Sequence, residues 1–176
     1  MAYDMIGPPH QLANCPYDGL AKSVKDYASY GVAAHKIVFG LPWYGYRFPC
    51  ANSTRSAACE PNCADGRKTC PQIDYAAAVQ ELNNFSRTTG IDEWKLDTAS
   101  QSVYFESLSM DGASRHQLWF DDEVSLAAKY RACRAFGARG VAMWTAGSLE
   151  YGNEGSAGYN RTATMWGALR EFTLAT

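Results

Sequence analysis

Aromatic residues stand at the ends of two predicted strands, where their rings could bind a ligand. Trp144 follows the apolar run 140–143, and the cluster 43–46 (Trp-Tyr-Gly-Tyr) follows the run 37–41 and Pro42. An apolar run without alternation predicts a short strand covered on both faces. In a parallel α/β barrel, ligands bind at the carboxyl ends of the strands. Trp144 is therefore predicted to form the floor of a site, although a tryptophan at such a position can also belong to the core.

Helices and strands are predicted to alternate around these two positions. Hydrophobic spacing, capping residues and turn residues define them. The expected strands are 1–4 (the end of a buried strand), 37–41, 102–108, 115–120 and 140–145; the pair 102–108 and 115–120 forms a hairpin with its turn at Asp111-Gly112. The expected helices are 19–30 capped by Asp18, about 74–87 capped by Asp74, Asp121 or Asp122 to about 136, and roughly 162–172.

This order predicts an α/β fold in which parallel strands are joined by helical crossovers. A small α+β subdomain is expected as an insertion at 49–120, made of a cysteine-rich loop and the hairpin. An eight-stranded barrel usually takes about 250 residues. Three barrel strands in a chain of 176 residues therefore predict the back part of a (β/α)8 barrel, strands 6–8, over 1–176.

Composition excludes several classes of protein. An apolar share of 47% with 13% aromatic residues argues against disorder. A net charge of −2 provides no basic surface for nucleic acid, and no apolar stretch approaches the roughly 18 residues of a membrane span. The sequence has no Gly-rich phosphate loop, no Gly-x-Ser-x-Gly and no His-Glu-x-x-His, so we expect no cofactor and no metal.

Cysteines and glycosylation sequons indicate an oxidising compartment. Of six cysteines, four crowd into one loop (Cys50, Cys59, Cys63, Cys70), and Asn-x-Ser/Thr sequons begin at Asn52, Asn84 and Asn160. We expect disulfides in this loop, with three possible pairings. A zinc site is the less favoured alternative, because only one close cysteine pair is present and no histidine is nearby. No signal peptide opens the chain, so we expect the mature protein to begin upstream. Cys133 is expected to be buried and inert.

Four short motifs, in this order, resemble glycoside hydrolase family 18, the chitinases and chitobiases. Residues 1–4 (Met-Ala-Tyr-Asp) resemble the Met-x-Tyr-Asp motif of the sixth barrel strand, and 40–45 (Gly-Leu-Pro-Trp-Tyr-Gly) resemble the seventh. Residues 117–122 look like the end of the inserted subdomain, and 140–144 resemble the eighth strand with its subsite tryptophan. The resemblance covers nearly the whole chain, and the cysteine loop looks most like the di-N-acetylchitobiase branch.

The resemblance implies hydrolysis of β-1,4-linked N-acetylglucosamine oligosaccharides, from chitin or N-glycan cores. These enzymes use the 2-acetamido group of the substrate in place of a protein nucleophile. By match to the family motifs, the catalytic residues here are Tyr3, whose hydroxyl would bind the acetamide, and Asp4, which would contact the sugar. Trp144 would stack under the sugar ring and Tyr44 would line the wall; Trp43 and Met1 complete the expected substrate-binding set.

The general acid of the family is absent from this sequence. No Asp-x-x-Asp-x-Asp-x-Glu motif occurs, and Tyr46 stands where many chitinases carry Arg. We interpret Glu150 and Glu154 as solvated loop carboxylates. We interpret the three histidines, His10, His35 and His116, as surface or structural residues. We therefore expect the C-terminal half of a lysosomal or extracellular glycosidase, inactive, unstable or self-associating without the N-terminal half of its barrel. The alternatives are a non-catalytic chitinase-like lectin and a non-functional product of internal initiation.

Overall fold

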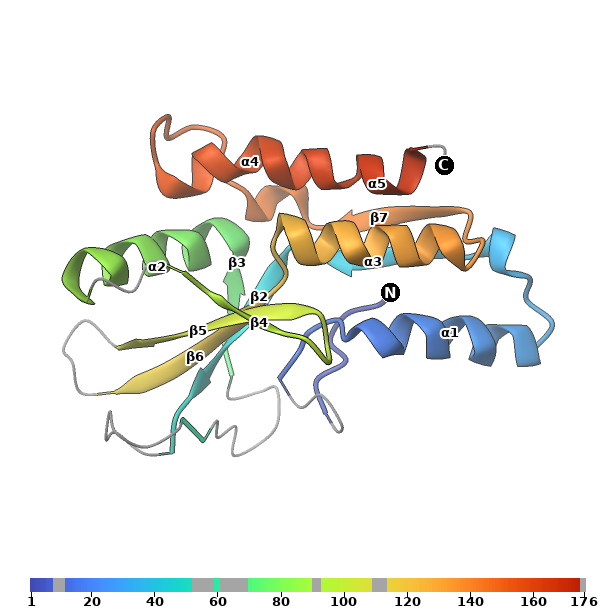
Figure 1. Ribbon diagram of the computed structural model, residues 1–176, viewed down its shortest axis with the longest axis horizontal. Coiled ribbons are helices and arrows are strands. Elements are labelled where there is room, and N and C mark those ends of the chain that lie inside the picture. Colours follow the sequence, from blue (N-terminus) through green and yellow to red (C-terminus); the bar gives the residue numbers. More distant parts are fainter. Residues whose placement is uncertain (8–11, 52–58, 61–69, 90–92, 109–113, 175–176) are drawn as a thin grey trace.

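The computed structural model describes residues 1–7, 12–51, 59–60, 70–89, 93–108 and 114–174. They form a mixed α/β structure with an antiparallel sheet and α2 at one end of the molecule (Figure 1). A parallel pair of strands lies at the other end beside α1 and α3, while α4 packs against both α2 and α3. Within the described ranges, no helix is long and apolar enough to cross a membrane. The elements are α1 Tyr17–Ser29, η1 Ala34–Lys36, β1 Val38–Pro42, β2 Tyr44–Pro49, β3 Gln72–Asp74, α2 Tyr75–Thr89, β4 Lys95–Asp97, β5 Ser102–Leu108, β6 Arg115–Phe120, α3 Glu123–Ala135, β7 Gly140–Trp144, η3 Ala146–Ser148, α4 Ala157–Ala168 and α5 Arg170–Thr173.

The five-stranded antiparallel sheet has the order β3-β2-β6-β5-β4. Apolar side chains spaced two apart on β5 and on β6 are buried, and they join one hydrophobic core with the inner face of α2. The residues concerned are Val103, Phe105, Leu118, Phe120, Val79 and Leu82. The sequence predicted β5 and β6 correctly, but it missed β2, β3 and β4. Two of these are three-residue strands, too short for alternation to reveal.

The parallel pair consists of β1 and β7, aligned so that Phe39 lies opposite Val141. The prediction that the 140–145 strand is covered on both faces is wrong in this structure. Ala142 and Trp144 are exposed and the other residues of β7 are half-buried. The physical reason is that, among the described residues, β7 pairs with β1 alone in a two-stranded sheet, which leaves part of its surface open to solvent.

Several predicted element boundaries shift. Residues 1–4 form no strand; they are tied to β1 by a hydrogen bond from Ala2 N to Gly40 O (2.7 Å). Helix α1 begins at Tyr17 after Pro16, so Asp18 lies in the first turn and is not the cap. The predicted helix 162–172 is two helices, α4 and α5, and α4 begins at residue 157, where the Ser156 hydroxyl accepts a hydrogen bond from a backbone N–H of the first turn.

Helix α3 begins where the sequence predicted. The side chain of Asp122 accepts a hydrogen bond from Ser125 N, and Ser125 Oγ accepts one from Asp122 N. This reciprocal pairing satisfies two backbone donors that a helix start leaves open. Behind the cap, Lys129 and Asp121 form an ion pair in which both side chains are completely buried. Lys129 Nζ also donates to Ser102 Oγ on β5 (2.9 Å), so the pair links α3 to the antiparallel sheet.

The expectation of disulfides in the cysteine loop is confirmed. Cys50 and Cys59 form a disulfide with Cα atoms 5.1 Å apart, which removes Cys59 from any zinc site. Cys70 is also disulfide-bonded, and Cys63 lies outside the described residues. Cys15 and Cys133 are free and buried. Burial raises the pKa of both thiols to about 12, so neither is a nucleophile at neutral pH.

Candidate active site

Two aromatic rings from opposite ends of the chain meet beside the parallel pair. The rings of Tyr3 and Trp144 stack with centroids 6.3 Å apart and planes at 25°. Trp144 is 56% exposed, and Trp43 N donates to Trp144 O (2.7 Å) at the end of β7. The indole is therefore anchored through its backbone while much of its ring faces solvent. A flat apolar surface of this kind suits the apolar face of a sugar ring.

Asp4 lies at the centre of the cluster and accepts hydrogen bonds from two phenols. Tyr44 OH and Tyr46 OH both donate to Asp4 Oδ1, at 2.5 and 2.6 Å. The rings of Tyr3 and Tyr44 meet edge to face with centroids 6.0 Å apart. Burial, and then the hydrogen bond to the carboxylate of Asp4, raises the pKa of the Tyr44 phenol. Tyr44 thus stays protonated and remains a donor to Asp4.

Gly45 explains how two tyrosines reach one carboxylate. A Cβ atom at this position would lie 2.1 Å from Trp119 O and 2.6 Å from Phe120 Cβ on β6. Only a residue without a side chain lets β2 approach β6 this closely. Tyr44 and Tyr46 flank it on the same face of β2, because alternate strand residues share a face. Sequence analysis noted Tyr46 only as a departure from the family pattern; its spacing from Tyr44 would have revealed its role if 44–49 had been predicted as a strand.

The structure corrects the prediction for Trp43. Its side chain is completely buried in the core, where Trp43 Nε1 donates to Tyr130 OH (3.0 Å) and the ring packs edge to face on Trp166. Alternation along the chain sends Trp43 inward while its neighbour Tyr44 faces the site. Trp43 therefore cannot contact a substrate. Met1 is 88% exposed, and its Sδ accepts a hydrogen bond from Tyr3 OH (2.7 Å).

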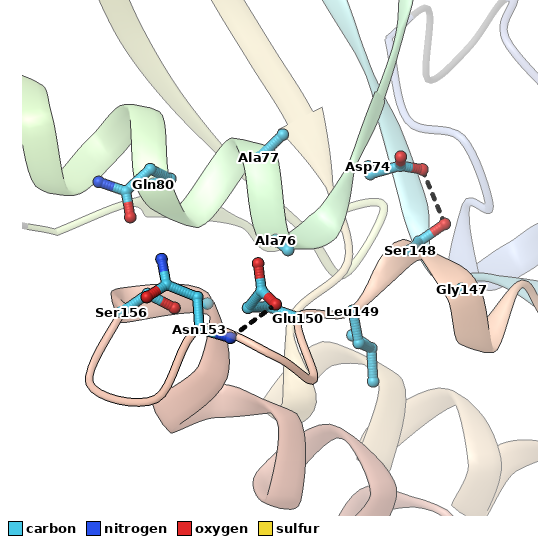
Figure 2. A pocket seen from close by; sticks show the side chains of 11 residues that line it. Asp74, Ala76, Ala77, Gln80, Gly147, Ser148, Leu149, Glu150, Asn153 and Ser156 are labelled. Carbon is cyan, nitrogen blue, oxygen red and sulfur yellow. Dashed lines mark hydrogen bonds between the residues drawn. The ribbon is translucent and has the colours of Figure 1, made fainter.

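A separate cleft of about 370 Å³ lies between the start of α2 and the segment 147–158 (Figure 2). Its carboxylates have partners within the protein. Asp74 Oδ1 accepts from Ser148 Oγ (2.8 Å), and Glu150 Oε1 accepts from the backbone N–H groups of Gly152 and Asn153 (2.8 and 3.1 Å). Those backbone hydrogen bonds lower the pKa of Glu150. Glu150 is therefore poorly suited to act as a general acid.

The described histidines and Glu154 occupy the surface or structural positions that the sequence predicted for them. His116 is buried on β6 with Nε2 2.6 Å from Glu81 Oε1, His35 is exposed, and His10 lies outside the described residues. Glu154 is exposed in the turn before α4. In the part of the chain that the structure describes, no three His, Cys, Asp or Glu side chains gather in a way that could hold a metal ion.

Comparison with known proteins finds a matching family model and similar relatives. The family model of glycosyl hydrolases family 18 matches residues 1–148. Rat di-N-acetylchitobiase is 31% identical over 166 residues, which is 90% of this chain and 43% of the rat protein. The chain thus spans less than half the length of this relative.

Solved structures show the same fold. A chitinase from Chromobacterium violaceum matches 100% of this chain and 45% of its own, with a TM-score of 0.66 and 20% identity. A Cycas revoluta family 18 chitinase solved in complex with (GlcNAc)4 matches 99% of this chain and 46% of its own, with a TM-score of 0.63 and 17% identity. Because the family model matches residues 1–148 of the 176, the chain belongs to glycosyl hydrolases family 18.

Proposed function

We propose that this chain provides the sugar-binding part of a family 18 active site that hydrolyses β-1,4-linked N-acetylglucosamine oligosaccharides with retention. The observation that carries the proposal is the meeting of Tyr3, Asp4, Tyr44 and Trp144, which come from three distant segments. The relatives support the substrate class, because one is a di-N-acetylchitobiase and another was solved with (GlcNAc)4.

Each side chain of the cluster suits one contact with an acetylated amino sugar. The Trp144 ring would stack under the sugar, and the Tyr3 hydroxyl would turn from Met1 Sδ to the acetamide of the substrate. Asp4 would bind the same group or a neighbouring hydroxyl, with its carboxylate held by Tyr44. Such positioning supports attack by the acetamide oxygen on the anomeric carbon, an intramolecular step with a high effective molarity.

The proton donor is proposed to lie outside residues 1–176. The sequence contains no Asp-x-x-Asp-x-Asp-x-Glu motif, and Glu150 is occupied by backbone donors. We further propose that β1 and β7 are strands of a (β/α)8 barrel and that an insertion at 49–120 supplies β3, β4, β5 and β6, which pair with β2 in the antiparallel sheet. A disulfide between Cys50 and Cys59 supports a lysosomal or extracellular setting.

Binding without hydrolysis is the second candidate function. It is favoured by one observation: the chain has an exposed Trp144 next to Tyr3 and Asp4, yet it lacks the family's acid motif. A chitinase-like agglutinin from Robinia pseudoacacia has a related fold, with a TM-score of 0.55 and 16% identity. The residue that the gene encodes at the acid position separates the two candidates: Glu indicates an enzyme, and Gln, Leu or Ile a lectin.

The test uses chain 1–176 with two measurements. Binding of (GlcNAc)4 is followed by tryptophan fluorescence, and turnover by a fluorogenic chitobioside. We expect binding, and a rate at least roughly 10²–10⁴ below that of a complete family enzyme, since a general acid contributes about that factor. Turnover near that of a complete enzyme would overturn the proposal that the acid lies elsewhere. Absence of binding at millimolar sugar would overturn the proposed site.

Tyr3→Phe and Trp144→Ala serve as site variants, with Tyr30→Ala as the matched control. Tyr30 is an exposed aromatic residue at the end of α1, so its loss should leave sugar binding unchanged. Both site variants should weaken binding, because each removes a contact with the sugar. Equal affinity in all three variants would show that the sugar binds elsewhere.

A further inference from the structure

A buried amide side chain joins the turn that carries Asp4 to strand β2. Asn14 is only 1% exposed. Its Oδ1 accepts a hydrogen bond from Asp4 N (2.7 Å), and its Nδ2 donates to Tyr44 O (3.0 Å). Its backbone carbonyl accepts from Met5 N (3.1 Å). Asn14 therefore binds two consecutive residues of one segment and the backbone of another.

Asp4 needs this support because its backbone is in the left-handed region, with φ of 61°. L-residues visit this region rarely, and a non-glycine residue stays there only when its surroundings require it. Asn14 holds the backbone of Asp4 in this conformation, because its side chain accepts a hydrogen bond from Asp4 N and its backbone carbonyl accepts one from Met5 N. The left-handed turn directs the carboxylate of Asp4 to the two phenols of β2.

The hydrogen bond from Asn14 Nδ2 to Tyr44 O fixes strand β2 relative to the turn at Asp4. Tyr44 uses its carbonyl for Asn14 and its phenol for Asp4. A single residue thereby binds Asp4 and Tyr44 through their backbones while their side chains bind each other. Asparagine suits this position because its amide carries an acceptor and a donor without charge. Alanine offers neither, and an ionised carboxylate offers no donor.

We propose that Asn14 is the positioning residue of the site: it fixes the left-handed turn at Asp4 and registers that turn against β2, so that Asp4 and Tyr44 meet in the arrangement that binds the sugar. The claim about sugar binding rests on the proposed function. The claim about geometry does not, because it concerns the free protein.

The first test compares wild type with Asn14→Ala by amide hydrogen exchange and by (GlcNAc)4 binding. We expect protection of the Asp4 amide to fall about tenfold or more, and affinity to fall by a similar factor, since a buried hydrogen bond is lost on each side. Ser125→Ala is the control: Ser125 is equally buried, and its hydrogen bonds are with Asp121 and Asp122. It should lower stability without changing either readout.

Asn14→Asp provides a variant with a distinctive pH signature. When protonated, its carboxyl carries the same acceptor and donor as the amide; when ionised, it repels Tyr44 O. The ionised carboxylate still accepts from Asp4 N but no longer donates to Tyr44 O. Affinity for (GlcNAc)4, taken relative to wild type at the same pH, should therefore be closest to wild type near about pH 4 and fall at neutral pH, whereas Asn14→Ala shows no such recovery. Asp4, Tyr44 and Tyr46 also face this position, so wild type at each pH is the reference.

The outcomes separate the two claims. Unchanged Asp4 protection in Asn14→Ala, or affinity within twofold of wild type, overturns the positioning role. If Asn14→Ala does not fold, the pH recovery of Asn14→Asp decides, and its absence overturns the role. If wild type binds no oligosaccharide, the proposed function fails, and hydrogen exchange alone decides whether Asn14 holds Asp4.

Discussion

The antiparallel sheet and the parallel pair differ in how they bury their side chains. Within the antiparallel sheet, Phe105, Leu118 and Phe120 are at most 2% exposed. In the parallel pair, Val38 and Trp144 are 51% and 56% exposed. The first region buries most of its apolar side chains, with Leu96 on β4 as an exception, whereas the second buries Phe39 and Leu41 but leaves Val38 and Trp144 open to solvent. The candidate site lies where they meet, so one region supplies fixed phenols and the other an accessible indole.

The largest effect is expected from breaking the ion pair that ties α3 to the antiparallel sheet. Lys129→Met leaves the side chain of Asp121 buried without its charged partner. Burial already raises the pKa of the Asp121 carboxyl in the wild type. We expect a loss of about 3–5 kcal/mol in the free energy of unfolding, measured with urea. The double variant with Asp121→Asn should recover much of this loss, because no buried charge remains. Lys22→Ala, in an exposed pair, should change little.

Two truncations, one of a buried and one of an exposed apolar side chain, test the comparison. Leu118→Ala removes a completely buried side chain from the antiparallel sheet, and it should cost about 2–5 kcal/mol of stability. Val38→Ala removes an exposed side chain from the parallel pair, and it should cost less than about 0.5 kcal/mol. Equal losses in urea unfolding would contradict the conclusion that the two regions are buried differently.

The exposed indole should matter for binding and not for folding. Trp144→Ala is expected to weaken (GlcNAc)4 binding by about tenfold, or about 1.4 kcal/mol, while the melting temperature stays near that of wild type. Titration by isothermal calorimetry together with thermal unfolding measures both. A large loss of stability would mean that Trp144 is core after all, the alternative that its sequence left open.

The smallest effect is expected from Glu81, a residue of α2 whose carboxylate pairs with Arg47 on β2 and His116 on β6. Burial raises the pKa of Glu81, but the hydrogen bond with His116 and the charge of Arg47 outweigh it, so the pKa lies below its ordinary 4.5. A lowered folded-state pKa contributes stability above the unfolded value, and that stability is lost as the pH falls through the folded one.

Thermal unfolding measured from about pH 6 to pH 3 detects this loss of stability. That pH range spans the ordinary pKa of a carboxyl group. Wild type should lose stability more steeply than Glu81→Gln. Glu106→Gln is the comparison, because Glu106 pairs with Arg115 and also has a lowered pKa, but its side chain is 38% exposed. Its variant should flatten the profile less. Parallel profiles for wild type and Glu81→Gln would show that the pair contributes nothing.

Local signals in the sequence were sufficient for the family, the long elements and most of the candidate site. The alternation in 102–108 and 115–120, the capping residue Asp122 and the apolar run before Trp144 each act over a few neighbouring residues, so they can be read directly. The motif residues Tyr3, Asp4, Tyr44 and Trp144 were named in advance, and the structure brings them together.

Tertiary contacts decided the rest. Trp43 and Tyr44 are adjacent aromatics, and only packing against Tyr130 shows that Trp43 belongs to the core. The roles of Tyr46 and Asn14 depend on hydrogen bonds to Asp4 across 42 and 10 positions of chain. The exposure of β7 depends on which strands lie beside it. Composition and periodicity describe what a residue prefers, but its partners are set by the three-dimensional path of the chain.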